Sequence, residues 1–401
     1  MNLEVRLLKY RDELGWTQLQ VAAALKVPRE LISMWENGTR RPNLRQLEDL
    51  AQLFDTTASY LLGEKGSSSQ PARPKLLLRG FDNASPEATI EIGRWLKFLD
   101  HWSDLLDESE CPGRGQPPKK IDQGPDVSDI RKASKLAAEV REYFELGLFC
   151  LPDLYAFLND HSMLVYQAPL GSIGDGHQGI SGAFYNHPKL GYCVLINSQT
   201  SRGRQTFTLA HEFAHALYHY GTRDCIVNLQ GECSSKEQFA DAFAAHFLVP
   251  SRGLKEIVEA NEWAKPKQLS EYGVLMLAHY YSVSYPFMLN RLAFEGHITG
   301  EQKSLWQQYS PRSLARHVGI DPEHFQSRVD SEVYLNRYPA SVLNKVRWFI
   351  ENDHLSVGQA ADLLRLDRIT IQVDLLQKPA QASDEEKRET KEFAHTYGSD
   401  G

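Results

Sequence analysis

Two histidines stand four residues apart, with a glutamate directly after the first of them: His211, Glu212 and His215. Apolar residues recur at helical spacing from Thr206 to His219, so both imidazoles should lie on one face of a helix. Two neutral imidazoles at this spacing can bind one zinc ion. Glu212 lies beside the first histidine, where a carboxylate can take a proton from an attacking water and later pass it to a leaving amine.

A pair of acidic residues downstream supports this interpretation, because the histidine spacing alone is only moderately specific. Glu237 and Asp241 are four residues apart in a pattern rich in Ala, Phe and Leu that predicts a second helix ending at Pro250. The arrangement resembles zinc proteases of the gluzincin type, in which a glutamate on a second helix is the third ligand. In that type, an aspartate one turn later accepts a hydrogen bond from the first histidine and fixes its tautomer.

The gluzincin resemblance implies one Zn²⁺ per chain, bound by His211, His215 and Glu237, with Asp241 hydrogen-bonded to His211. The fourth zinc position stays open for water, as catalysis requires. Glu232 is a rival third ligand, but it lies before the predicted helix and has no acidic partner one turn on. We therefore favour Glu237.

A third histidine, His219, lies four residues beyond His215 on the same face of the predicted helix. His211 and His219 are about 12 Å apart along the helix axis, so a single zinc ion cannot bind all three histidines. His219 and its neighbour Tyr218 could instead line the cleft and stabilise a developing oxyanion. A structural hydrogen bond at the edge of the cleft is an equally good interpretation of His219.

Three short segments rich in β-branched and aromatic residues predict strands before the histidine helix, at residues 163–167, 180–185 and 192–196. Zincin-like enzymes have a small sheet beside this helix, and an edge strand of the sheet pairs with the extended substrate. By that analogy, we expect strand 192–196 to hold a peptide against the metal. The Gly- and Ser-rich stretch 171–179 could form a flexible rim of the cleft.

The first sixty residues predict four short helices separated by Gly, Pro and Asn signals, at residues 6–14, 18–25, 28–36 and 44–54. The short turn between the second and third of them is typical of a helix-turn-helix, whose second helix lies in the major groove of DNA. Residues 1–64 contain eight Lys and Arg against nine Asp and Glu. Only the face around Lys26, Arg29, Arg40 and Arg41 is positive, and a module that docks protein is the alternative.

Residues 2–64 resemble the Xre/Cro/C1 family of bacterial repressors. The matching stretches are Gly15–Gln18, Ile32–Gly38, Arg41–Pro42 and Leu47–Leu61. The resemblance implies that Gln18 contacts a phosphate and that four residues of the third helix face base edges. Those four are Arg29, Glu30, Ser33 and Met34, and the residues implied to meet the DNA backbone after the helix are Arg40 and Arg41.

Residues 130–295 resemble the ImmA/IrrE family of metallopeptidases. Beyond the histidine and acidic motifs, the matching residues are Asn197, Phe207–Ala210, His219, Phe243–Ala245, Val249–Pro250, Val283–Ser284 and Arg291–Leu292. The resemblance implies an endopeptidase in which zinc polarises the scissile carbonyl and Glu212 acts as general base and then acid. Members of the family cleave a repressor or an antitoxin, so the implied substrate is a regulatory protein of that kind.

The composition indicates a soluble, multidomain protein, because 401 residues exceed one ordinary core and 42% of them are hydrophobic. No apolar run has the length of about 20 residues that spans a bilayer, and the N-terminus does not resemble a secretion signal. Five scattered cysteines without a CxxC pair favour a reducing cytoplasm. The net charge of −8 requires any DNA contact to come from a local basic patch.

We predict a mainly α protein with a small β-sheet (α+β). Residues 1–65 form the helix-turn-helix domain, 66–127 a linker with a connector or dimer helix at 86–107, and 128–295 a zincin-like metallopeptidase domain. Residues 296–377 form a helical C-terminal region, and 378–401 form a disordered tail. Within that region, 355–364 resembles the first half of another helix-turn-helix. A helical pair that packs on the peptidase or senses a partner is the favoured interpretation there.

Together these features predict a regulator that binds double-stranded operator DNA and cleaves a repressor or antitoxin at the promoter. The alternative is a DNA-binding repressor or antitoxin whose metallopeptidase-like domain is mainly structural or sensory. The family resemblance also implies a cognate toxin or defence protein and a homodimer as partners. No membrane partner is expected.

Overall fold

The structure is a computed structural model of the chain, and it describes residues 2–13, 17–25, 27–54, 58–63, 86–108, 128–151, 153–161, 163–171, 180–219, 226–229, 234–263, 269–321 and 337–376. Several predicted features lie outside these residues: Gly15, Lys26, Glu232, most of the predicted rim 171–179, the linkers on either side of residues 86–108, and the tail 378–401. The chain divides into two compact units, residues 1–341 and 342–401. No described helix is both long enough and apolar enough to cross a membrane.

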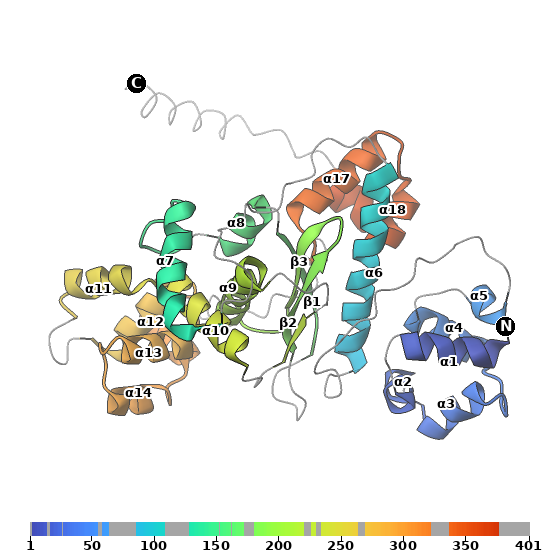
Figure 1. Cartoon of the computed structure of the whole chain (residues 1–401), viewed down its shortest axis with the longest axis horizontal. Coiled ribbons are helices and arrows are strands. Elements are labelled where there is room, and N and C mark those ends of the chain that lie inside the picture. Colours follow the sequence, from blue (N-terminus) through green and yellow to red (C-terminus); the bar gives the residue numbers. More distant parts are fainter. Residues whose placement is uncertain are drawn as a thin grey trace. The chain divides into compact units, whose positions relative to one another are not determined.

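The N-terminal part contains the four predicted helices and a short fifth one (Figure 1). Their bounds are α1 (Leu3–Glu13), α2 (Gln18–Leu25), α3 (Arg29–Glu36), α4 (Leu44–Leu53) and α5 (Ala58–Leu62). The helices enclose a small core in which Tyr10 stacks on Phe54, with the ring centroids 5.7 Å apart, and in which Trp35 is 1% exposed. The helix-turn-helix pair α2 and α3 therefore rests on a core of its own.

The predicted small sheet is present, with four strands in the described part of the chain. They are β1 (Leu164–Ala168), β2 (Ile180–His187), β3 (Gly191–Asn197) and β4 (Ile226–Leu229), in the order β1-β3-β2-β4. Strand β3 pairs with β1 in parallel and with β2 antiparallel. The expectation that strand 192–196 pairs with a substrate is therefore wrong, because both of its edges already have partner strands.

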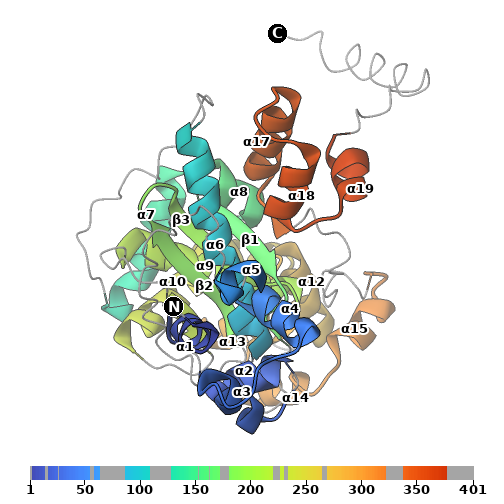
Figure 2. The ribbon, with the colours of Figure 1, turned by 90° about the vertical axis from the view of Figure 1, so that its right-hand side faces the viewer.

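Helices cover both faces of the sheet (Figure 1). Helix α9 (Arg202–Tyr218) packs on β2 and β3 and belongs to the main core, together with α10 (Ser235–Leu248) and α7 (Ala133–Tyr143). Helix α6 (Pro86–Glu108) lies on the other side and crosses in front of the strands in Figure 2. Its Phe98 ring contacts the ring of Tyr166 on β1, with the centroids 5.5 Å apart. The predicted connector helix is thus packed against the sheet.

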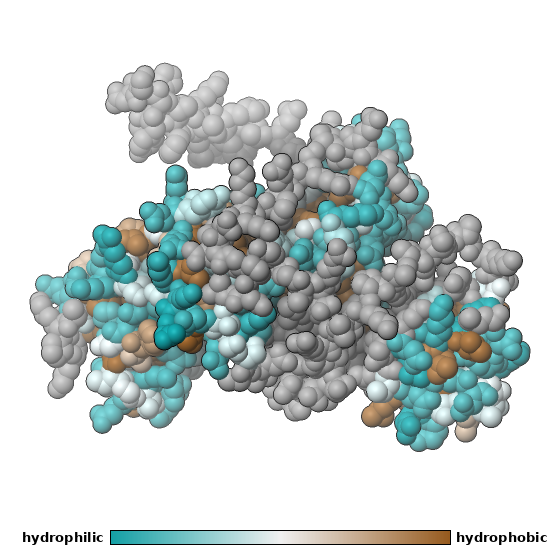
Figure 3. Space-filling view, in the orientation of Figure 1, coloured by the Kyte–Doolittle hydropathy of each residue, from teal (hydrophilic) through white to brown (hydrophobic). Residues whose placement is uncertain are grey.

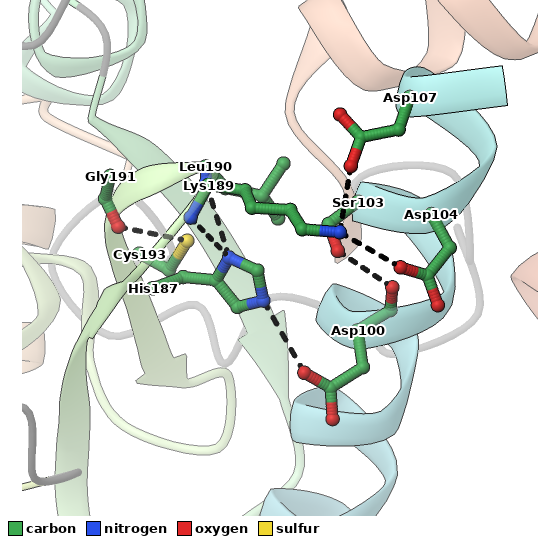
Figure 4. Close-up of polar contacts among 9 residues, drawn as sticks. All are labelled: Asp100, Ser103, Asp104, Asp107, His187, Lys189, Leu190, Gly191 and Cys193. Atoms are coloured by element: carbon green, nitrogen blue, oxygen red, sulfur yellow. Dashed lines mark hydrogen bonds and ion pairs between the residues drawn. The ribbon is translucent and has the colours of Figure 1, made fainter. Parts of the chain in front are cut away.

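Two ion pairs and one hydrogen bond join α6 to the end of β2 and to the turn that follows it (Figure 4). Lys189 Nζ lies 3.1 Å from Asp104 Oδ1 and 2.7 Å from Asp107 Oδ2. His187 Nε2 lies 3.3 Å from Asp100 Oδ1. The two half-exposed pairs of Lys189 contribute little stability individually, so the buried aromatic contacts of α6 must supply most of its attachment.

The remaining helices of the first unit complete its main core. They are the short 3-10 helix η2 (Ile130–Lys132), α8 (Leu154–Asp160), α11 (Ser251–Ala260), α12 (Glu271–Tyr280), α13 (Tyr285–Phe294), α14 (Gly300–Trp306) and α15 (Pro311–His317). Trp306 and Leu314 belong to the same core as α9. The chain therefore does not divide at residue 296 as predicted, because α14 and α15 bury their apolar faces in the preceding domain.

The second unit begins within α17 (Ala340–Glu351) and continues with α18 (Val357–Leu364), α19 (Arg368–Thr370) and the π-helical turn η4 (Ile371–Leu375). Its buried side chains include Val346, Phe349, Leu364 and Ile371. A capping box starts α18, since Ser356 accepts from the backbone of Gln359 and Gln359 accepts from the backbone of Ser356.

Candidate metal centre

Helix α9 is buried along most of its length and carries the predicted catalytic residues. His211 is 4% exposed, Glu212 1% and His215 2%. The helix can lie this deep because Gly203 contacts the backbone between α12 and α13. A Cβ atom there would lie 2.3 Å from the backbone nitrogen of Ser284. The absence of a side chain at this glycine therefore sets how closely α9 approaches the following helices.

Helix α10 supplies the acidic residues, and both of its ends are fixed. At the start, the side chain of Ser234 accepts a hydrogen bond from the backbone N–H of Glu237. At the end, Arg141 Nη1 donates to Phe247 O at 2.6 Å and Arg291 Nε donates to Val249 O at 3.1 Å. These guanidinium groups bind carbonyls that a helix end leaves without partners. The sequence analysis missed the role of Arg141, for which an arginine within an apolar helical stripe is the available signal.

Three side chains converge as predicted, from two different helices. His211 Nε2 lies 3.0 Å from Glu237 Oε2 and 3.0 Å from His215 Nε2, and His215 Nε2 lies 3.3 Å from Glu237 Oε1. Ligand atoms bound tetrahedrally to one zinc ion are roughly 3.4 Å apart, given bond lengths of about 2.1 Å. The two imidazoles and the carboxylate therefore fit a single divalent ion, and this ligand set suits zinc.

Each of the two histidines has a hydrogen-bond partner at its other ring nitrogen. His211 Nδ1 lies 2.8 Å from Asp241 Oδ1, as expected for an aspartate that fixes the tautomer. His215 Nδ1 lies 2.8 Å from Nδ1 of His219, which is 5% exposed. If His215 binds an ion through Nε2, its Nδ1–H must donate to His219. His219 therefore makes the structural hydrogen bond that the sequence analysis kept as an alternative.

Tyr218 does not line a cleft, and that expectation is wrong. Its side chain is fully buried, and its ring contacts Phe239 and Phe243 with the centroids 5.4 and 5.6 Å apart. The hydroxyl group has no hydrogen-bond partner among the described residues, and burial raises its pKa well above the usual range. The ring of Tyr218 is therefore part of the core between α9 and α10.

Opposing effects set the pKa values of His211 and Glu237. Burial lowers the pKa of His211, but hydrogen bonds with Asp241 and Glu237 and the charge of Glu212 raise it to about 10. Burial raises the pKa of Glu237, but hydrogen bonds with His211 and His215 hold it well below its usual range. Because an imidazole nitrogen binds a metal ion only when it is deprotonated, metal binding at this site should depend on pH.

The predicted DNA-contacting residues of α3 lie at its surface. Arg29, Glu30, Arg40 and Arg41 are exposed, Met34 is 43% exposed, and Ser33 is half-buried and accepts a hydrogen bond from Asn37. The space-filling view shows brown patches among teal residues in this domain (Figure 3). Gln18 Nε2 donates to Glu36 Oε2 at 2.8 Å, so its amide is tied to the end of α3. A phosphate contact of Gln18 stays a prediction.

Residues 159–293 match the family model of the IrrE N-terminal-like domain, a peptidase family numbered M78. Residues 7–61 match a helix-turn-helix family model. The chain is also 40% identical over 72 residues to the HTH-type transcriptional regulator AnsR of Bacillus subtilis (strain 168). That match covers 18% of this chain and spans 61% of the length of AnsR. The chain thus combines a helix-turn-helix domain with a domain that is similar to the IrrE-like peptidase family.

The IrrE-like region contains every residue of the candidate metal centre, but some residues that hold its helices in place lie outside the region. Helix α7 precedes the matched residues, packs on α10 and carries Arg141. Asn197, at the end of β3, links neighbouring segments: its Nδ2 donates to the carbonyls of Gly171 and Ile180, and its Oδ1 accepts from Leu170 N. These contacts fix the strand ends on the side where α9 begins.

Proposed function

We propose that the IrrE-like domain is a zinc-dependent endopeptidase and that the chain is a DNA-binding transcriptional regulator. The convergence of His211, His215 and Glu237 carries this proposal, because two imidazole nitrogens and a carboxylate this close together can bind one divalent ion. Glu212 lies on the same buried helix, next to the first histidine.

The roles of the side chains follow from their positions. His211 and His215, through Nε2, and Glu237 would hold the ion, while Asp241 and His219 keep the two imidazoles in the required tautomer. A bound zinc ion supplies Lewis-acid polarisation of the scissile carbonyl and of water. Glu212 then removes the proton from the attacking water and delivers it to the departing amine.

The substrate we propose is a repressor or antitoxin-type regulatory protein, cleaved in an extended segment. The helix-turn-helix domain supports this class, since it would bring the peptidase to operator DNA. Among the described strands, β1 and β4 are the edges of the sheet. In chain order, strand β4 lies between the histidine helix α9 and the glutamate helix α10, so we propose that the substrate backbone adds to β4.

The decisive experiment compares wild type with Glu212→Gln, measuring metal content and cleavage of the regulators encoded next to this gene. We expect both proteins to hold about one zinc ion per chain and only the wild type to cleave. Glu256→Gln, which makes the same change at an exposed site on α11, should cleave normally. If the wild type binds zinc and DNA but cleaves none of these regulators, the alternative of a repressor or antitoxin with a structural or sensory domain is supported instead.

A further inference from the structure

The second compact unit repeats the helix lengths of the N-terminal helix-turn-helix. Helices α2 and α3 have eight residues each, with residues 26–28 between them. Helix α18 also has eight residues, and residues 365–367 separate it from a second helical segment formed by the three residues of α19 and the five of η4. Both pairs therefore follow the order of eight helical residues, a three-residue turn and eight helical residues.

The two pairs also share their internal contacts. Positions four and five of the first helix are buried in both: Val21 and Ala22 in one, Ala360 and Ala361 in the other. The backbone of the turn makes the same hydrogen bond, from Val27 N to Ala22 O at 2.9 Å and from Leu366 N to Ala361 O at 3.0 Å. The agreement therefore extends from helix lengths to the path of the chain through the turn.

Local signals fix the second turn. Arg365 adopts the left-handed conformation with φ 53° and ψ 43°, which ends α18. Asp367 then caps the following helix, because its Oδ1 accepts from Thr370 N at 2.8 Å. Leu366, between them, is 9% exposed and anchors the turn in the core of the unit.

The second helical segment presents side chains at the positions that would read DNA. Ile371 and Leu375 are buried, whereas positions one, two, five and six are exposed: Arg368, Ile369, Gln372 and Val373. In α3, the same four positions hold the residues predicted to face bases. Arginine can recognise guanine, glutamine can recognise adenine, and apolar side chains can contact the thymine methyl group.

The charge of the second unit is comparable to that of the first helix-turn-helix. Residues 342–376 contain four Lys and Arg against five Asp and Glu, and residues 1–64 contain eight against nine. Two of the four cations, Arg365 and Arg368, are exposed at the turn and at the start of the second helical segment. We propose that residues 340–376 form a second helix-turn-helix and that the chain binds duplex DNA at two separate sequence blocks.

The test is selection of binding sites by the full chain from a library of random-sequence DNA duplexes. We expect wild type to enrich two sequence blocks, and Arg368→Ala/Gln372→Ala to enrich only one of them. On a duplex carrying both blocks, the double variant should bind at least about tenfold more weakly, as expected for losing direct base contacts. Arg29→Ala/Ser33→Ala should lose the other block, which separates failure of this proposal from failure of the N-terminal domain.

Lys345→Ala, which removes a positive charge from α17, is the matched control and should select both blocks. Circular dichroism must show unchanged helix content in every variant, since none of the replaced side chains is fully buried. A single block that Arg368→Ala/Gln372→Ala still selects with wild-type affinity would overturn the proposal. The proposal would also be overturned if Arg368→Ala/Gln372→Ala changed the mass of the protein assembly in solution but left DNA binding unchanged, because the second unit would then bind protein.

Discussion

The two histidine ligands present the same nitrogen to the candidate metal centre but are held by chemically different partners. His211 is hydrogen-bonded to the carboxylate of Asp241, whereas His215 is hydrogen-bonded to the imidazole of His219. An anionic acceptor increases the basicity of an imidazole ligand more than a neutral one does. The two ligands are therefore expected to contribute unequally to metal affinity.

Replacing His219 should weaken zinc binding without removing a ligand. We expect His219→Phe to lower zinc affinity about 10- to 100-fold, because His215 loses the acceptor that fixes its tautomer. His219→Asn keeps an acceptor and should retain more of the affinity. Competition against a chromophoric chelator measures this effect, and the absorption spectrum of the Co²⁺-loaded protein reports on ligand geometry. Equal affinities for wild type and His219→Phe would show that the bond is incidental.

His246 should make the stability of the first unit depend on pH. Burial and then the charge of Arg291, whose Nη2 contacts its Nδ1 at 2.8 Å, lower the pKa of His246 to about 4. An unfolded histidine has a pKa of about 6.5, so between these values the unfolded chain binds more protons than the folded chain. Stability is thus full above about pH 6.5 and falls as the pH drops toward 4.

Urea unfolding at several pH values measures this dependence, with a chelator present so that no metal ion is bound. His246→Gln keeps an acceptor for Arg291 but cannot titrate, so its stability should fall less steeply between pH 6.5 and 4. Parallel curves for the variant and the wild type would assign the pH dependence to other groups.

At this scale, periodicity was sufficient to pair His211 with His215 and Glu237 with Asp241, because an interval of four residues places side chains on one face of a helix. That the two pairs meet was implied by the resemblance to gluzincins, and it depends on the packing of α10 on α9. Spacing does not determine what the second nitrogen of a ring contacts, so the partner of His215 was left open. It also could not show that Tyr218, one residue before His219, faces the core.

Among the elements, the approach of α9 to the turn before α13 depends on a glycine. Gly203→Ala would bring a Cβ within 2.3 Å of a backbone nitrogen, which cannot move without shifting the helix. We expect a loss of about 1–3 kcal/mol in the free energy of unfolding, together with weaker zinc binding. Thermal and urea unfolding measure the loss.

Gly93→Ala is the matched control, because this glycine also lies within a helix, α6, but a Cβ added to it would meet no described atom within 4 Å. It should be neutral or stabilising by up to about 1 kcal/mol. Similar losses for both variants would mean that helix propensity or general strain, rather than the contact with Ser284, governs stability at Gly203.

The helices and strands themselves could be predicted from the sequence, but which of them pack or pair with one another could not. Capping signals and apolar periodicity predicted α2, α3, α9 and α10, since these depend on residues within a few turns. The order of strands in a sheet depends on long-range pairing, so the sequence could not show that β3 is internal. For the same reason, it could not show that α6 packs on the sheet.

For the whole molecule, the two compact units should respond differently to metal. The first contains the candidate metal centre, and the second has a separate buried group that includes Val346 and Phe349. We expect calorimetry of the zinc-loaded chain to show two transitions, of which a chelator lowers the temperature of one. A chelator that shifts both transitions equally would show that the units unfold together.

The internal position of β3 has a consequence for when cleavage can occur. Because β3 is paired on both sides, a substrate of the proposed endopeptidase would pair only with an edge strand, and only once the segment to be bound had unfolded. A tightly folded substrate would then not be cleaved. The same substrate would be cleaved once it is locally unfolded or newly released from its partner. The conformation of the substrate would then determine when cleavage occurs.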